Sequence, residues 1–152
     1  MMTMRTNTSQ SVQDHRDSAP ASVRCAILTV SDTRTFETDR SGGLIKDLLI
    51  QHDHVVADYR IVPDEPALIH AVLNEWSTDH NLDAILTNGG TGIAQRDTTY
   101  DVVVSMCEKR LDGFGELFRA LSYQEIGAAA MLSRAVAGVI GGRFVVAMPG
   151  ST

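Results

Sequence analysis

Short apolar runs alternate along this chain with longer segments of helical spacing, and this alternation is the feature that most constrains the fold. The predicted strands are the apolar runs at residues 24–30, 54–62, 83–87 and 144–148. The predicted helices carry apolar side chains every three or four positions and cover residues 44–52, 66–76 and 98–109. Strands that alternate with helices of this length form parallel sheets. We therefore expect an α/β fold, a three-layer α/β/α sandwich with a mostly parallel sheet.

The two ends of the chain depart from this pattern. Residues 1–21 are rich in Ser, Thr, Gln and Asp, and they are predicted to be a disordered leader. A tight break is predicted at residues 113–115, followed by helical stretches at 117–122 and 124–138. The small residues of 124–138 indicate close helix packing or a subunit interface. With 152 residues and 43% hydrophobic content, one domain is expected over residues 22–152.

Charge and composition exclude several classes of protein. The formal net charge is −6 and there is no basic run, so nucleic acid is not an expected partner. No run of about 18 apolar residues and no signal peptide is present, so we expect no membrane contact and a cytoplasmic protein. Cys25 and Cys107 lie in apolar surroundings and are predicted to be free buried thiols. The histidines lack zinc-site spacing, so no transition metal is expected.

Polar loops follow the predicted strands, and these loops are the candidate site. In an open parallel sheet, ligands bind outside the carboxyl ends of the strands, so SDTR, PDE, NGGTG and PGS are expected to line one edge. The stretch TNGGTGIAQRD places Gly89, Gly90 and Gly92 directly before a predicted helix. Bare backbone at the start of a helix can bind an anion such as phosphate. The alternative is a turn that needs glycine for positive φ.

Two aspartates at this edge are candidates for metal binding. Asp64 and Asp97 each have an ordinary explanation as the beginning of a helix, since Asp97 fits an N-cap and Asp64 precedes a proline. Beside a phosphate, however, a pair of carboxylates can hold Mg²⁺. Ser31 and Asp32 are candidates for polar contacts or for a simple turn. The candidate cationic partners of a phosphate are Arg34, Arg96, Arg119 and Arg134.

Seven motifs, in order, resemble the molybdenum cofactor biosynthesis MoaB/MogA family. They are ILTVSDTR, SGGLIKDLL, IVPDE, TNGGTGIAQRD, GFGELFRALSYQEIG, LSRAVAG and AMPGS. The match runs from Arg24 to Thr152, and the EIG and LSRAVAG wording is closer to the MoaB branch. The resemblance implies the molybdopterin-binding fold, a homo-trimer or a hexamer, and molybdopterin as ligand. In the adenylyltransferase members, the molybdopterin phosphate attacks MgATP, accepts AMP and releases pyrophosphate.

The resemblance also implies roles for individual residues. Asp64 and Asp97 match the two functionally important acids, with Mg²⁺ between them and the phosphates. The matching phosphate-binding positions are Ser31, Asp32, Gly89, Gly90, Thr91, Gly92 and Ser151. The chain departs from the family at Asn88, where other members have Thr, and this change is expected to alter a turn. The family's PGS motif opens a helix, whereas this sequence stops at Thr152, so the domain is expected to lack a C-terminal helix.

Three functions therefore remain open at the level of sequence. The first is a MgATP-dependent molybdopterin adenylyltransferase, which the acid pair and the glycine loop suggest. The second is a protein that binds or carries molybdopterin without chemistry. The third is a structural oligomer that binds no ligand. Phosphoryl-type transfer needs positioning and neutralisation of charge, and it needs no nucleophile on the protein.

Overall fold

A six-stranded sheet forms the centre of the protein in the computed structural model, which describes residues 9–150. The strand order is β2-β1-β3-β6-β5-β4. The strands are β1 (Arg24–Val30), β2 (Val55–Val62), β3 (Ala84–Asn88), β4 (Lys109–Arg110), β5 (Val136–Ile140) and β6 (Arg143–Met148). The first four strands in spatial order are parallel, while β5 and β4 are antiparallel to their neighbours. The prediction of a mostly parallel α/β sheet is confirmed.

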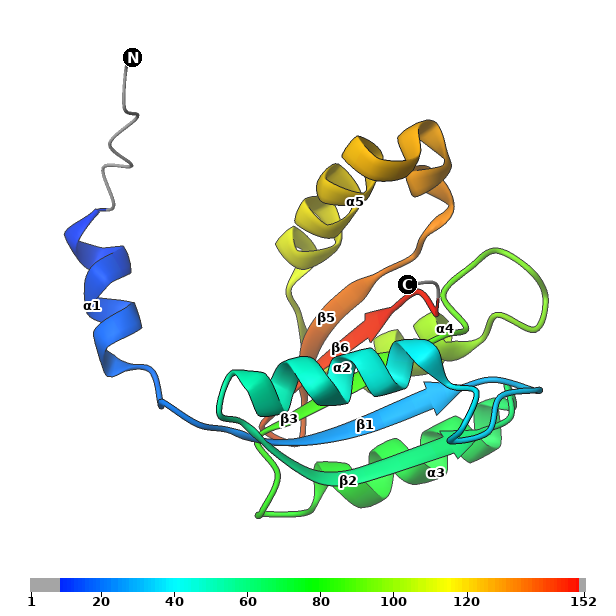
Figure 1. The fold of residues 1–152 in the computed structure, drawn as a ribbon, viewed down its shortest axis with the longest axis horizontal. Helices are drawn as coiled ribbons and strands as arrows, with labels where there is room; N and C mark the ends of the chain where they lie inside the picture. The colour runs from blue at the N-terminus through cyan, green and yellow to red at the C-terminus, as the bar shows by residue number, and fades with distance from the viewer. Residues whose placement is uncertain (1–8, 151–152) are drawn as a thin grey trace.

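Helices cover both faces of the sheet, which confirms the predicted three layers (Figure 1). Helix α2 (Arg40–Gln51) packs on β1 and β2, whereas α3 (Pro66–Ser77) and α4 (Thr99–Met106) cover the opposite face. The main apolar core lies under α3 and α4, where Ile69, Leu73 and Trp76 are almost completely buried. On α2 the apolar side chains are less completely buried than their helical spacing suggests, because Leu44 and Leu48 remain 48% and 45% exposed.

Helix α5 (Asp112–Ile126) and the 3-10 helix η1 (Gly127–Leu132) project from the sheet rather than lying on it (Figure 1). The predicted break at residues 113–115 is wrong, because these residues lie inside α5. The predicted helix at 124–138 is wrong at its end, where residues 136–140 form β5. Alanine favours helices, but pairing of β5 with β6 across the register Val136 to Ala147 outweighs that preference.

The predicted leader contains a helix where the sequence indicated disorder. Helix α1 (Gln10–Ser18) begins at Ser9, whose hydroxyl accepts a hydrogen bond from the Val12 amide. Hydrogen bonds four residues apart, from Gln10 to Asp14 and from Gln13 to Asp17, support the helix, yet none of its residues is buried. It therefore adds nothing to the core. In residues 9–150, no helix is long and apolar enough to cross a membrane.

Candidate functional site

The loops that follow the parallel strands meet at one edge of the sheet, as the sequence predicts. The Ser31 amide donates to the Val62 carbonyl at 2.9 Å, joining the ends of β1 and β2. The Gly89 amide donates to the Met148 carbonyl at 2.9 Å, joining the ends of β3 and β6. We call this edge the rim. Ser151, predicted to contribute from the last loop, lies outside the described residues.

The glycines of the loop are required by contacts inside the protein. Gly89 and Gly90 have φ values of 91° and 70°, the left-handed region that favours glycine. A Cβ at Gly89 would fall within 3.0 Å of the Val30 carbonyl oxygen, and one at Gly92 would lie 2.7 Å from a carboxylate oxygen of Asp97. The turn explanation therefore holds for Gly89 and Gly90 without any ligand, whereas Gly92 leaves room for the Asp97 carboxylate.

The loop nevertheless presents backbone donors that the protein itself does not use. Within residues 9–150, the amides of Gly90, Thr91 and Gly92 donate to no protein acceptor. Thr91 is buried, and Gly90 and Gly92 are half-buried. Backbone donors that are removed from bulk water are normally paired, so consecutive amides without a protein acceptor are candidates for binding an anion.

Asp64 connects the loop after β2 to the beginning of α4. It is 8% exposed, and its Oδ1 accepts hydrogen bonds from the Thr98 amide at 3.2 Å and the Thr98 hydroxyl at 2.5 Å. The helix that follows Asp64 in sequence, α3, begins instead at Glu65 and Pro66. Asp64 thus stabilises a helix distant in sequence, and its Oδ2 accepts no hydrogen bond within the described chain.

Asp97 lies directly before Thr98 and therefore next to the contacts of Asp64. Its predicted N-cap role is wrong, because the N-cap of α4 is Thr98, whose own side chain makes no capping hydrogen bond. The Asp97 carboxylate turns back into its own loop, where Oδ2 accepts from the Ala94 amide at 2.9 Å. Asp97 Oδ1 has no protein donor in residues 9–150. Asp64 thus contacts Thr98, the residue directly after Asp97, and within residues 9–150 each carboxylate has one oxygen that accepts no hydrogen bond.

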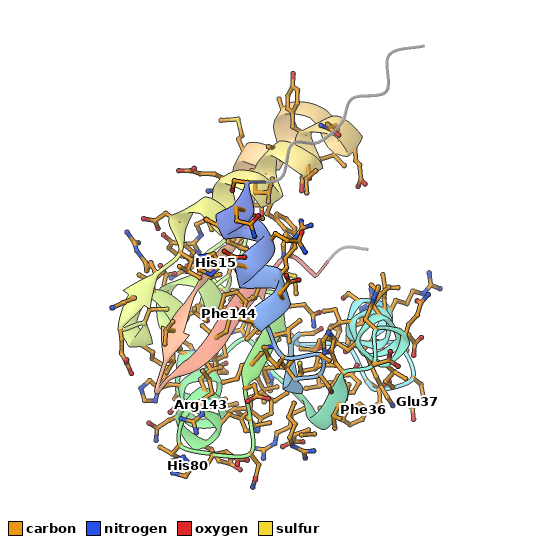
Figure 2. All side chains as sticks on the ribbon, turned by 90° about the vertical axis from the view of Figure 1, so that its left-hand side faces the viewer. His15, Phe36, Glu37, His80, Arg143 and Phe144 are labelled. Atoms are coloured by element: carbon orange, nitrogen blue, oxygen red, sulfur yellow. The ribbon has the colours of Figure 1, made fainter. Side chains whose placement is uncertain are left out.

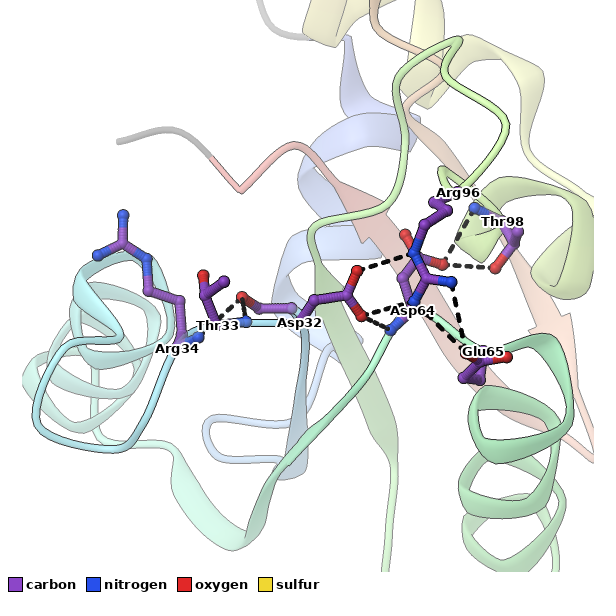
Figure 3. A network of polar contacts seen from close by, with 8 residues as sticks. Asp32, Thr33, Arg34, Asp64, Glu65, Arg96 and Thr98 are labelled. Carbon is purple, nitrogen blue, oxygen red and sulfur yellow. Dashed lines mark hydrogen bonds and ion pairs between the residues drawn. The ribbon is translucent and has the colours of Figure 1, made fainter.

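Asp32 ties the loops after β1, β2 and β3 together (Figure 3). Its carboxylate accepts from Arg96 through Nε at 2.9 Å and Nη2 at 2.8 Å, and from the Asp64 amide at 3.0 Å. Arg96 also reaches Glu65 at 3.4 Å. The hydrogen bonds from Arg96 and then from Asp64 lower the pKa of the Asp32 carboxyl. An ionised carboxylate has no hydrogen to donate to a phosphate, so in this structure Asp32 instead fixes the backbone of Asp64.

The candidate arginines do not face the loop as free cations. Arg134 uses its guanidinium for the carbonyls of Gly92 and Asp97 and for the carboxylate of Asp101. Arg119 donates to the carbonyls of Ser133 and Ala135. Arg34 points away from Asp64 (Figure 3) and donates to the Thr38 carbonyl. Within the described residues, the donors available to an anion at the glycine loop are therefore the loop's backbone amides, to which an added cation could add positive charge.

Two pockets border the rim. One, of about 380 Å³, is lined by Ser31, Asp32, Arg34, Phe36 and Pro63 among others. The Ser31 hydroxyl accepts from the amides of Thr33 and Arg34, so it shapes this loop. The other, of about 340 Å³, lies between the glycine loop and α5 and includes Thr91 and Gly92. The rim therefore has space for more than one ligand.

Sequence reasoning missed a buried polar cluster beneath the rim. Asn88, expected only to alter a turn, is 1% exposed and donates through Nδ2 to the Thr29 hydroxyl at 2.9 Å. Thr29 in turn donates to Asp39, which also accepts from Tyr59. The Ser41 hydroxyl lies within hydrogen-bonding distance of Asn88 Oδ1 and of the Gly150 carbonyl. The only signal in the sequence was a polar residue at the end of an apolar strand.

The chain resembles known proteins over almost its whole described length. Residues 26–152 match the family model described as "Probable molybdopterin binding domain". The molybdenum cofactor biosynthesis protein B of Halalkalibacterium halodurans is 55% identical over 143 residues, which cover 93% of this chain and 84% of that protein. A crystal structure of a molybdenum cofactor biosynthesis protein B is 50% identical with a TM-score of 0.83, covering 88% of this chain and 83% of that one.

A third relative extends the likeness to a different metal pathway. The tungsten cofactor synthesizing protein MoaB from Pyrococcus furiosus is 38% identical with a TM-score of 0.78, covering 88% of this chain and 85% of that one. The match in order, spacing and architecture is therefore continuous, and the resemblance read from the motifs is confirmed. This chain belongs to the molybdopterin-binding-domain family that includes the molybdenum cofactor biosynthesis proteins MoaB.

Proposed function

We propose that this protein binds molybdopterin at the rim and transfers AMP from MgATP to the molybdopterin phosphate. The observation that carries the proposal is the set of unused amides at Gly90, Thr91 and Gly92 next to two carboxylates with free oxygens. Amides of this kind suit a phosphate, and carboxylates beside a phosphate suit Mg²⁺. The names of the relatives place them in molybdenum or tungsten cofactor synthesis.

The residues at the rim fit Mg²⁺ only in the presence of a phosphate. Residues 9–150 contain no group of three or more His, Cys, Asp or Glu side chains arranged to hold a metal. Asp64 and Asp97 would supply two oxygens, and phosphate oxygens and water would complete the hard-oxygen shell that Mg²⁺ prefers. When bound, the ion would neutralise phosphate charge, which the engaged arginines of the rim cannot do.

The protein's own contribution to AMP transfer is positioning. An oxygen of the molybdopterin phosphate attacks the α-phosphorus of ATP, a new P–O bond forms, and the bond to pyrophosphate breaks. The amides of the glycine loop hold one phosphate, while Thr98 and Ala94 fix the directions of Asp64 and Asp97. Two pockets bordering the same rim, of about 380 and 340 Å³, are consistent with a reaction between two ligands.

Pyrophosphate release tests the proposal. Purified protein given molybdopterin and MgATP is expected to release pyrophosphate, and Asp97→Asn is expected to abolish the release while the variant stays folded. Asp47→Asn, which changes an exposed acid on α2, is the matched control and is expected to behave as the wild type. Release that persists in Asp97→Asn would contradict the assignment of that carboxylate.

One observation favours a carrier without chemistry as the second candidate. Arg96, Arg119 and Arg134 all have partners inside the protein, so none of these three is free to stabilise departing pyrophosphate. A carrier would bind molybdopterin tightly and consume no ATP. Titration of molybdopterin with and without MgATP, together with the pyrophosphate assay, separates the two candidates.

We also propose that the protein assembles into a homo-oligomer through α5 and η1, residues 112–132. Large apolar side chains on this segment are exposed, including Leu117, Leu121, Ile126 and Met131 at 63, 57, 60 and 77%. Apolar surface concentrated on a projecting element is typical of a protein interface. Light scattering is expected to report a trimer or a hexamer for the wild type. Leu121→Ser is expected to weaken the association of the oligomer. A wild-type monomer at micromolar concentration would contradict the proposal.

A further inference from the structure

Arg134 contacts the glycine loop at both ends. Its amide donates to the Thr91 carbonyl at 2.9 Å, and its Nε donates to the Gly92 carbonyl at 2.9 Å. Its Nη2 donates to the Asp97 carbonyl at 2.7 Å, at the other end of the loop. One residue therefore holds the segment from Thr91 to Asp97 closed, although it lies 37 residues after Asp97 in sequence.

The guanidinium of Arg134 is itself fixed by α4. Its Nη1 and Nη2 pair with the Asp101 carboxylate at 3.1 and 3.3 Å, and its Cζ lies 4.7 Å from the centre of the Tyr100 ring. Each of these contacts uses a different edge or face of a planar group. A lysine at this position would keep the positive charge but could not make all of these contacts. The Arg134→Lys substitution therefore tests geometry separately from charge.

Arg119 of α5 holds the backbone on both sides of Arg134. Its Nη1 donates to the carbonyls of Ser133 at 3.3 Å and Ala135 at 3.2 Å. Gly115 permits this contact, because a Cβ there would lie 2.6 Å from the Ala135 carbonyl oxygen and 2.8 Å from Arg119 Nη2. The close approach of α5 to the chain at Ala135 therefore depends on a missing side chain.

The remainder of α5 stands away from the core. Of its 15 residues, Gly115 alone is buried. A cavity of about 480 Å³, lined by Arg119, Arg134 and Tyr100 among others, lies beside this contact. The position of α5 thus affects Arg134 through a small contact made by Gly115 and Arg119. This contact lies next to open space.

We propose that Arg119 and Arg134 are positioning residues through which α5 sets the conformation of the glycine loop and of Asp97. Arg119 fixes the backbone of Arg134, and Arg134 fixes the carbonyls of the loop. Neither side chain is needed to touch the ligand. The consequence for ligand binding rests on the proposed function of the rim, whereas the effect on the loop does not.

Hydrogen exchange of the full-length protein tests the positioning without any ligand. In Arg119→Gln and Arg134→Lys, the amides of Ala94 and Arg134 are expected to exchange about tenfold faster or more, because the loop loses hydrogen bonds that oppose its opening. Arg143→Gln is the matched control. Arg143 also donates to backbone carbonyls but lies beside His80, at the start of β6 and away from the rim (Figure 2). If the Ala94 amide exchanges at the wild-type rate in both Arg119→Gln and Arg134→Lys, the proposal is overturned.

A pair of glycine substitutions keeps the test valid if an arginine variant fails to fold. Gly115→Ala is expected to displace Arg119 and accelerate exchange at Ala94, whereas Gly113→Ala, which meets nothing within 4 Å, is expected to leave it unchanged. Equal effects of the two substitutions would overturn the role of the α5 contact.

Titration with molybdopterin then separates this inference from the proposed function. If the wild type binds, Arg119→Gln and Arg134→Lys are both expected to weaken binding about tenfold or more, in proportion to loop opening. Faster exchange in the loop with unchanged affinity would overturn the link between loop and ligand. If the wild type does not bind, the proposed function is wrong, and hydrogen exchange still decides the positioning.

Discussion

Gly42 and Gly43 lie side by side in α2, and we predict opposite effects when each is replaced by alanine. A Cβ at Gly42 would fall within 3.0 Å of three oxygen atoms, those of Asp39 Oδ2, Tyr59 and Thr29. A Cβ at Gly43 would meet nothing within 4 Å. The same chemical change is thus made on the same helix, once against the buried polar cluster and once in open space.

The magnitude follows from the hydrogen bonds that Asp39 accepts. Asp39 is 5% exposed and accepts from Thr29 at 2.6 Å, from the Gly42 amide at 3.0 Å, and from Tyr59. Hydrogen bonds to a charged group contribute about 1.5–3 kcal/mol each, so disruption of two costs about 3–6 kcal/mol. Replacing a helical glycine with alanine by itself stabilises a protein by about 0.5–1 kcal/mol. We therefore expect Gly42→Ala to destabilise the protein by about 2–5 kcal/mol and Gly43→Ala to stabilise it by up to about 1 kcal/mol.

Urea denaturation followed by tryptophan fluorescence measures both changes, since Trp76 is buried in the core. The midpoint is expected to fall sharply for Gly42→Ala and to rise slightly for Gly43→Ala, at an unchanged slope. If Gly42→Ala has the stability of Gly43→Ala, the cluster around Asp39 is not packed as described, and its connection through Thr29 to Asn88 and the glycine loop is also wrong.

Three further predictions concern single side chains. Asp64→Asn retains an acceptor for Thr98 but loses its charge, so we expect a folded protein whose pyrophosphate release falls by about 100-fold or more; wild-type release would contradict a charged role for this group. The pKa of Asp32 is lowered in the folded state by Arg96 and the Asp64 amide, so this group stabilises the fold above its unfolded pKa and loses that effect as pH falls through the folded value. In Asp32→Asn, the urea midpoint is therefore expected to fall less on acidification than in the wild type. A fall equal to that of the wild type would refute this. Burial, and secondly Asp83, raises the pKa of the Cys25 thiol, so alkylation of Cys25 at pH 8 is expected only on unfolding, and rapid modification of the native protein would be inconsistent with its 1% exposure.

The parallel part of the fold was predictable because its signals are local. The predicted strand at residues 24–30 coincides with β1, and the predicted strand at 144–148 lies within β6. Each is a continuous apolar run, as expected for strands buried on both faces. The position of the rim then follows from the order of strands alone, since the carboxyl ends of parallel strands share one edge.

The antiparallel pairing of β5 with β6 has a local signal that sequence reasoning missed. Residues 136–138 follow an alanine-rich stretch and were assigned to its helix, yet β5 and β6 form a hairpin whose turn is Gly141 and Gly142, both at positive φ. The two glycines near residue 114 suggested a break, whereas Gly115 is needed for the approach of α5 to the Ala135 carbonyl. A contact with a segment distant in sequence decides the conformation at Gly115, whereas the local pair of glycines sets the turn between β5 and β6.

Positions of the site residues were predictable, but their partners were not. The sequence placed Asp64, Asp97 and the glycine loop at one edge; in the structure Asp64 accepts from Thr98 at this edge and Asp97 accepts from Ala94 of the loop. It could not show that Arg134 would be occupied by the carbonyls of Gly92 and Asp97 rather than by a phosphate. Such hydrogen bonds join residues about forty positions apart, and no local pattern reports them.

We propose above that the unused amides of the rim, together with Asp64 and Asp97, support AMP transfer to molybdopterin. The most direct measurement supplies ATP labelled at its α-phosphate together with molybdopterin and Mg²⁺, and follows the label into the pterin product while pyrophosphate is counted. We predict that each pyrophosphate released is matched by one labelled AMP joined to molybdopterin. Molybdopterin that binds while the label stays in ATP would contradict the claim and identify the protein as a carrier.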